Sequence, residues 1–132
     1  MKDIIFDEFQ DLVNSSLLKH KSIIDIMSKL QESNSRINRA VAKSVTSCGC
    51  IKINAEKQPN SLDEEDIANL SKHLKSHLHG TLCDNCREII ESEIGNNLFY
   101  INSLCNTLDI SLYDTLIKEY NKLNTLGDYS FK

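Results

Sequence analysis

Apolar side chains recur at every third or fourth position along most of this chain, which is the spacing of helices that bury one face. The pattern predicts five helices, at about residues 2–18, 23–45, 62–78, 83–108 and 112–126. The fourth is the most apolar and is expected to lie at the centre of the fold. Because the chain contains only 4 Gly and 1 Pro, little interrupts these helices. We therefore expect a single domain, 1–132, with an all-α fold that is a bundle of about five helices.

The second predicted helix is long and carries an apolar stripe that Asn34 interrupts. The stripe consists of Ile23, Ile26, Met27, Leu30, Ile37, Val41 and Val45. Ser22, followed by Asp25, is a suitable cap for this helix, since a hydroxyl can accept a free amide there. Long helices with such a repeat usually pack in a bundle or against a second copy of the chain. We therefore expect a homodimer.

The stretch between the second and fourth helices carries turn signals. Cys48-Gly49-Cys50 ends the second helix, and its glycine permits a sharp backbone turn. Residues 51–53 alternate apolar, polar and apolar, which is typical of a short extended piece. Gly80 is a fitting end for the third helix, and Asp84 is the expected cap of the fourth.

Charge and hydropathy exclude several kinds of partner. The net charge is −4 with 26% charged residues of both signs, so neither nucleic acid nor an acidic membrane surface is expected as a partner. No apolar run is long enough to cross a bilayer, and the acidic, amphipathic start of the chain lacks the apolar stretch of an export signal. A cytoplasmic location is the default expectation.

Four of the five cysteines stand in two close pairs, Cys48 with Cys50 and Cys83 with Cys86. In a reducing compartment such pairs are more often ligands or redox groups than disulfides. Four thiolates complete the tetrahedron that Zn²⁺ prefers and leave no open position, so the predicted site is structural. An iron–sulfur cluster, a reversible dithiol and four unrelated thiols are the alternatives. The fifth, Cys105, lies on an apolar stripe and is expected in the core.

Two further groups are candidates for binding, although each has a plainer explanation. His73, His77 and His79 are able to ligate a metal, with His79 best placed to replace a cysteine, but they suit a polar helix end equally well. A second group, on the second helix, is cationic and consists of Arg36, Arg39 and Lys43. It offers a phosphate site, yet a solvated helix face is the default interpretation.

The segment Glu93-Ile94-Gly95-Asn96-Asn97-Leu98-Phe99-Tyr100, together with residues 104–112, resembles the MazG-like all-α nucleoside triphosphate pyrophosphohydrolases. In that family a helix with E-L-G-D-x-L-F-Y-L leads through an L-x-I-x-L joint into the last helix. The resemblance covers about the last third of the chain, and the cysteine pattern is similar to that of small proteins of Firmicutes. It implies a MazG-like helical domain in which two acidic pairs, E-x-x-E and E-x-x-D, hold Mg²⁺ on the substrate phosphates.

This chain departs from the family at those pairs. Glu93 is present, but Asn96 replaces the aspartate, while Glu32 survives upstream and Ser35 replaces its partner. Asn and Ser are weak ligands for Mg²⁺, so the two remaining carboxylates are expected to form a vestigial nucleotide or metal pocket. Our first hypothesis is a non-catalytic, zinc-stabilised MazG-like protein that acts as a binding or regulatory module.

Two alternatives remain open. One is a Mg²⁺-dependent nucleoside triphosphate pyrophosphohydrolase with an altered site made of Glu32, Glu91 and Glu93. The other is a redox-sensing regulator in which Cys83 and Cys86 release a metal and form a disulfide.

Overall fold

The computed structural model describes residues 2–16, 21–58 and 74–126, and this part of the chain is mostly helical. Its α-helices are α1 (Lys2–Ser16), α2 (Ile23–Lys43), α4 (Asp84–Thr107) and α5 (Leu112–Leu126). A π-helical turn, η1 (Ser44–Cys48), continues α2, and two short strands follow, β1 (Ile51–Ile53) and β2 (Leu78–Gly80). The helices predicted near 2–18, 23–45, 83–108 and 112–126 are thereby confirmed.

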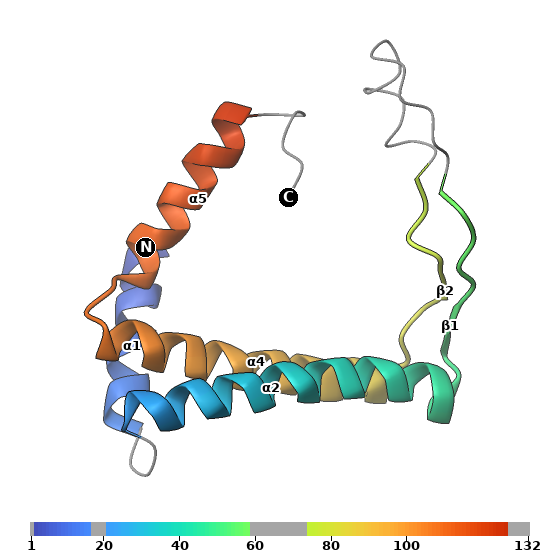
Figure 1. The fold of residues 1–132 in the computed structure, drawn as a ribbon, viewed down its shortest axis with the longest axis horizontal. Helices are drawn as coiled ribbons and strands as arrows, with labels where there is room; N and C mark the ends of the chain where they lie inside the picture. The colour runs from blue at the N-terminus through green and yellow to red at the C-terminus, as the bar shows by residue number, and fades with distance from the viewer. Residues whose placement is uncertain (1, 17–20, 59–73, 127–132) are drawn as a thin grey trace.

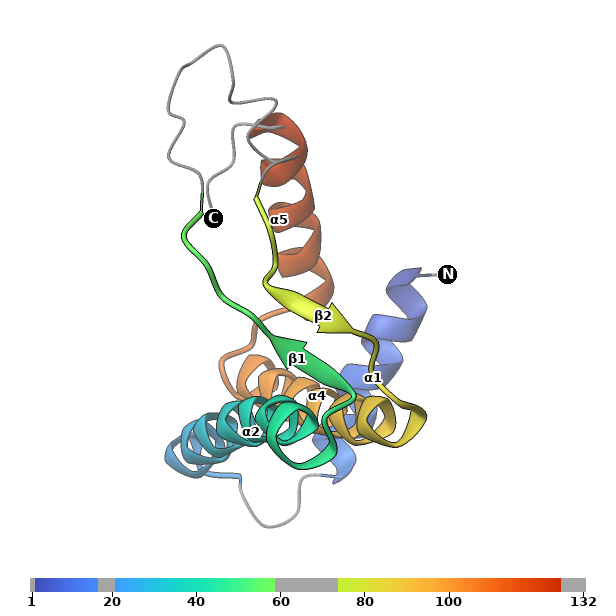
Figure 2. The same cartoon turned by 90° about the vertical axis from the view of Figure 1, so that its right-hand side faces the viewer.

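Helices α2 and α4 lie side by side and antiparallel, and they form the base of the fold (Figure 1). Their direction follows from contacts that run in opposite order, from Asn34 with Asn97 to Cys48 with Cys83. Helix α1 crosses the far end of α4, α5 rises from that corner, and β1 and β2 rise from the opposite end (Figures 1 and 2). The chain thus places its two-stranded hairpin where α2 ends and α4 begins.

The contact between α2 and α4 uses small side chains as well as apolar ones. Ile26 is fully buried on α2, as predicted, but Ser33 and Ser44 are buried with it. Met27 and Val41, which belong to the predicted stripe, are 57% and 36% exposed. The buried face therefore keeps most of the predicted stripe, since Ile23, Leu30, Ile37 and Val45 are half-buried, and it also includes Ser33 and Ser44.

The corner formed by α1, α4 and α5 is joined by amide side chains. Gln10 Nε2 donates to Asn106 Oδ1 at 3.0 Å, and Asn106 Nδ2 donates to the Gln10 carbonyl oxygen at 3.0 Å. Gln10 Oε1 also accepts from the Leu112 amide at 3.2 Å, at the start of α5. These reciprocal bonds fix α1 against the joint between α4 and α5.

The third predicted helix is wrong at its C-terminal end. Residues 74–77 are not helical, and residues 78–80 form β2, which pairs antiparallel with β1 so that Gly80 faces Ile51. Gly80 is therefore a strand residue and not a helix stop. The rest of this predicted helix, 62–73, lies outside the described residues. The extended piece predicted at 51–53 is confirmed as β1.

Within the described ranges, no helix combines the length and the hydrophobicity that crossing a bilayer requires.

Candidate metal centre

Four cysteine sulfur atoms converge where the end of α2, the hairpin and the start of α4 meet. The cysteine cluster consists of Cys48, Cys50, Cys83 and Cys86, whose Sγ atoms all lie within 4.8 Å of one another. The Cys48 and Cys83 Sγ atoms are 3.8 Å apart. A tetrahedron with metal–sulfur bonds of about 2.3 Å has edges of about 3.8 Å, so the donor set fits one metal ion. The structure thus brings together the four residues that the sequence predicts as ligands.

The first pair is positioned by the widened turn at the end of α2. In η1 the helix opens by one residue, and Gly49 then adopts φ +78°, with its amide donating to the Ser44 carbonyl oxygen at 2.9 Å. This left-handed conformation is the turn that the sequence predicts at Cys48-Gly49-Cys50, and glycine adopts it without a Cβ penalty. The turn allows both thiols, which are two positions apart in the chain, to reach the same space.

The second pair is positioned by the start of α4. Cys83, and not the predicted Asp84, is the N-cap, because its Sγ accepts a hydrogen bond from the Cys86 amide at 3.4 Å. Asp84 occupies the first turn instead, where a carboxylate favours the positive end of the helix. The cap therefore brings the two thiols of this C-x2-C pair to the end of one helix.

The hairpin holds the two pairs at contact distance. Gly80 has φ +87°, and a Cβ atom built on it would lie 2.6 Å from the Cys50 carbonyl oxygen. Only glycine permits so close an approach of the two backbones. Ile51, the residue that faces Gly80, is buried and anchors β1.

The pKa values of Cys83 and Cys86, the two thiols at the start of α4, are shifted in opposite directions. The backbone amide of Cys86, followed by its side chain, lowers the pKa of Cys83 to about 7, because both donate towards the sulfur. Ser44 lowers the pKa of Cys86, but the neighbouring Cys83 and desolvation outweigh it and raise that pKa to about 12. A metal ion therefore has one ready thiolate to bind first and must displace protons from its neighbours.

The two carboxylates of the predicted vestigial site also face each other. Glu32 on α2 and Glu93 on α4 line a cavity of about 180 Å³, together with Ser33, Asn96, Tyr100, Lys29 and Arg36. Arg36 Nε contacts Glu93 Oε2 at 3.0 Å, and Arg36 Nη1 lies 3.8 Å from Glu32 Oε1. Lys29 Nζ lies 3.3 Å from Glu32 Oε2. Both carboxylates are therefore already matched by cations of the chain itself.

Other predicted residues lie apart from the cysteine cluster. His77 precedes β2 and His79 lies within it, and neither belongs to the set of converging ligands; His73 lies outside the described residues. Cys105 is buried in α4, which confirms its predicted place in the core. Glu91 is exposed and does not line the cavity of Glu32 and Glu93. In the described part of the chain, the four cysteines are the group of ligands that comes together.

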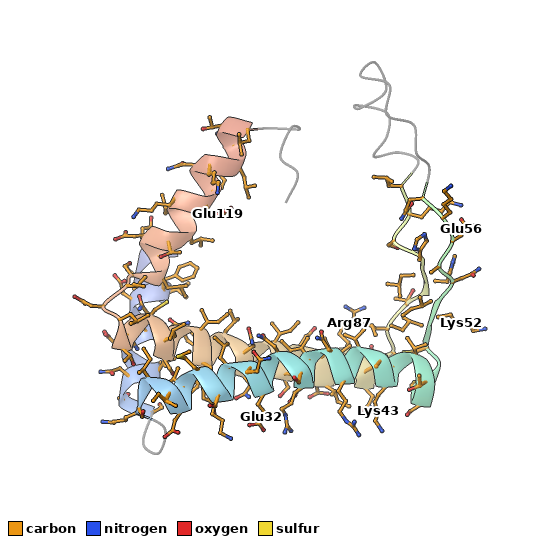
Figure 3. All side chains as sticks on the ribbon, in the orientation of Figure 1. Glu32, Lys43, Lys52, Glu56, Arg87 and Glu119 are labelled. Atoms are coloured by element: carbon orange, nitrogen blue, oxygen red, sulfur yellow. The ribbon has the colours of Figure 1, made fainter. Side chains whose placement is uncertain are left out.

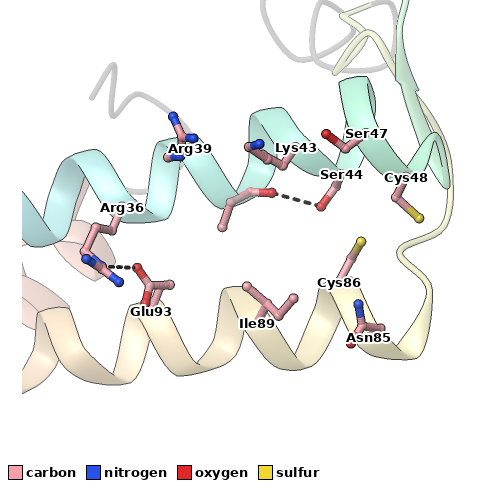
Figure 4. A pocket seen from close by; sticks show the side chains of 11 residues that line it. Arg36, Arg39, Lys43, Ser44, Ser47, Cys48, Asn85, Cys86, Ile89 and Glu93 are labelled. Atoms are coloured by element: carbon pink, nitrogen blue, oxygen red, sulfur yellow. Dashed lines mark hydrogen bonds and ion pairs between the residues drawn. The ribbon is translucent and has the colours of Figure 1, made fainter.

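Sequence reasoning missed the cross-helix role of Arg36. Glu32 and Arg36 are four positions apart, a spacing that by itself indicates only a pair along one helix. The shorter contact of Arg36 instead joins α2 to Glu93, 57 residues away. It also missed that Arg36, Arg39 and Lys43 border a cavity beside the cysteine cluster (Figure 4). The clustering of three cations at helical spacing was the available signal.

Comparisons with protein-family models, with curated proteins and with solved structures found no match. The MazG-like resemblance thus stays a prediction, and the function of this chain has to be inferred from its own residues.

Proposed function

We propose that this protein is a non-catalytic, MazG-like helical protein of the cytoplasm that forms a homodimer and acts as a binding or regulatory module. In this proposal one zinc ion on the cysteine cluster holds the hairpin and the ends of α2 and α4 together. The observation that carries the proposal is the convergence of four thiols within 4.8 Å from segments that are 35 residues apart.

The chemistry of the donor set favours zinc and a structural role. Thiolates are soft ligands that select zinc or iron–sulfur clusters over hard cations such as Mg²⁺. Four of them close the coordination shell, so no position remains for water or substrate. The four Sγ atoms lie within 4.8 Å of one another, a separation that suits a single ion better than a larger cluster.

Elemental analysis of the purified full-length protein tests the metal. We expect about one zinc per chain, bound tightly enough to survive gel filtration. Less than half an equivalent would contradict the metal site and would favour the redox dithiol of Cys83 and Cys86. One zinc accompanied by no iron would exclude the iron–sulfur alternative.

The absence of catalysis is supported by the arrangement around Glu32 and Glu93. Mg²⁺ sites use several oxygen ligands, most of them carboxylates and phosphates. Here Arg36 lies between the two carboxylates, at the position where a divalent cation would have to bind, and Asn96 offers only a neutral amide. We infer that this pocket is a vestige whose charge the chain now neutralises itself.

The alternative function is a nucleoside triphosphate pyrophosphohydrolase with an altered carboxylate site. One observation favours this alternative: Glu32 and Glu93 line the same cavity, together with Asn96. Release of pyrophosphate from a panel of nucleoside triphosphates with Mg²⁺ or Mn²⁺ distinguishes the two functions, and we expect none. Activity that disappears in both Glu32→Gln and Glu93→Gln would establish the alternative.

The proposed homodimer is supported by apolar side chains that α2 and α5 leave uncovered. Met27 on α2 and Tyr120 on α5 are 57% and 64% exposed, and the other exposed apolar residues of these helices are Ile24, Val41, Leu116, Ile117, Leu123 and Leu126. Contiguous apolar surface on helices usually packs against another chain. Light scattering after gel filtration should give twice the mass of one chain, whereas the mass of a single chain would contradict the dimer.

A further inference from the structure

A cavity of about 450 Å³ lies between the end of α2 and the start of α4, directly beside the cysteine cluster (Figure 4). Its volume falls in the range of about 300–1,000 Å³ that is typical of small-molecule sites. Cys48 and Cys86 form one end of it, and Glu93 with Arg36 forms the other. It is therefore a different cavity from the smaller one that holds Glu32 and Asn96.

One edge of this cavity is cationic. Arg36, Arg39 and Lys43 line it at positions i, i+3 and i+7 of α2, against Glu93 as the single carboxylate of the lining. Arg36 and Glu93 neutralise each other at 3.0 Å. Within the described residues, no carboxylate lies at ion-pair distance from Arg39 or Lys43. Two positive charges are thus left to attract an anion.

The opposite edge is apolar. Figure 4 shows Ile89 projecting from α4 into the space between the two helices, and this side chain is 48% exposed. Ala40 lines the same space from α2. A cavity lined both by apolar side chains and by two cations suits a ligand with an anionic end and an apolar body. Arginine and lysine together are typical partners of a phosphate group.

We propose that this cavity binds a phosphate-bearing small molecule, with its phosphate on Arg39 and Lys43 and its apolar body on Ile89. The proposal specifies a ligand for the binding role proposed above. It rests on the proposed zinc ion, because the ion would hold Cys48 and Cys86, which form one end of the cavity. The proposed phosphate site uses neither Glu32 nor Asn96, although Arg36 and Glu93 line both cavities.

Calorimetric titration of the zinc-loaded full-length protein tests the ligand chemistry. The probes are 1-naphthyl phosphate, inorganic phosphate, which lacks the apolar body, and 1-naphthol, which lacks the phosphate. We expect 1-naphthyl phosphate to bind at least 10-fold more tightly than either of the others, and its affinity to fall with added salt. Equal affinity for 1-naphthol would overturn the proposal, since it would show adsorption to apolar surface alone.

Substitutions then locate the site. The double variant Arg39→Ala/Lys43→Ala should bind 1-naphthyl phosphate at least 10-fold more weakly while it keeps one zinc per chain. Arg87→Ala is the matched control, because Arg87 is an exposed arginine of α4 that projects from the side of the α2–α4 pair opposite to Lys43 (Figure 3). It should leave the affinity unchanged within 2-fold.

Two results from the double variant would contradict the proposal in different ways. Unchanged affinity would place the ligand elsewhere. Loss of zinc would mean that Arg39 and Lys43 serve to offset the negative charge of the thiolates. A third result separates this proposal from the proposed function. If the wild-type protein holds no zinc and still binds 1-naphthyl phosphate tightly, the ligand site is supported and only the structural zinc ion is contradicted.

Discussion

Two groups of potential metal ligands lie along the contact between α2 and α4: the thiols of the cysteine cluster, where α2 ends and α4 begins, and the carboxylates of Glu32 and Glu93. In the cysteine cluster, four thiols converge within 4.8 Å, and among the described residues their sulfur atoms make hydrogen bonds with one another and with the backbone, not with a cationic side chain. Around Glu32 and Glu93, by contrast, Lys29 and Arg36 already supply the positive charge. From this difference we expect a metal ion at the thiols and none at the carboxylates, because a bound ion must also be the best available counter-charge.

Removing one thiol tests the cysteine cluster and should have the largest effect on metal content and thermal stability. Cys86→Ser removes one ligand of four, so we expect loss of zinc and a thermal midpoint lower by more than about 10 °C, as a chelator should also produce. Metal content and calorimetric scans measure both. Cys105→Ala is the matched control, since Cys105 is a buried cysteine of the same helix. The Cys105→Ala protein should keep one zinc per chain. If the Cys86→Ser protein also kept one zinc per chain, Cys86 would be excluded as a ligand.

A series of glycine substitutions tests the close approach of the Gly80 and Cys50 backbones beside the cysteine cluster. Gly80→Ala should destabilise the fold by about 2 kcal/mol or more and weaken zinc binding, because its Cβ would meet the Cys50 carbonyl oxygen. Gly49→Ala should cost only about 1 kcal/mol, since its φ is positive but its surroundings are open. Gly95→Ala, within α4 and with open space around it, should stabilise by about 0.5–1 kcal/mol. Urea titrations give the order, and equal effects at Gly80 and Gly49 would contradict the close approach.

Removing the charge of Arg36 tests the pair of carboxylates, Glu32 and Glu93. Arg36→Met leaves Glu93 without its partner, so the variant should bind Mn²⁺ several-fold more tightly than wild type, with a stability change of about 1 kcal/mol or less because the pair is partly exposed. Electron paramagnetic resonance titration measures free Mn²⁺ directly. Arg39→Met is the control, since Arg39 does not line the cavity of Glu32 and Glu93. Equal Mn²⁺ affinity in both variants would show that Arg36 does not occupy a cation position.

The smallest effect is expected from an ion pair that belongs to neither group. Lys75 lowers the pKa of Glu56 through a hydrogen bond and its charge, across 2.9 Å on the exposed hairpin side. A lowered carboxyl pKa contributes stability above the ordinary value of 4.5 and loses it as the pH falls through the lowered value. Glu56→Gln should therefore lower the thermal midpoint slightly at pH 7, and by less as the pH falls below 4.5. A difference that did not shrink on acidification would have to come from another cause.

The sequence predicts the ligands of the cysteine cluster because close cysteine spacing is a short-range signal. It also predicts α1, α2, α4 and α5, since their apolar spacing is regular. It fails for β2, where Leu74 and Leu78 have helical spacing but the pairing with β1 decides the structure. Pairing between segments that are far apart in the chain is not visible in local periodicity.

The sequence predicts only part of the buried face of α2, for a related reason. Apolar periodicity favours Met27 and Val41, whereas the contact with α4 buries Ser33 and Ser44. A serine counts as polar in any periodic pattern, yet its small size is what a close helix contact requires. The bond between Arg36 and Glu93 is similarly hidden, because only the antiparallel pairing of the helices brings these residues together.

The separation of the two cysteine pairs along the chain also has a consequence for protein synthesis. Cys83 lies 35 residues after Cys48, so at translation rates of about 5–20 residues per second it emerges from the ribosome about 2 to 7 s later. Until then Cys48 and Cys50 are two thiols on a nascent chain that lacks the other half of the cysteine cluster. During that interval the fold does not shield them.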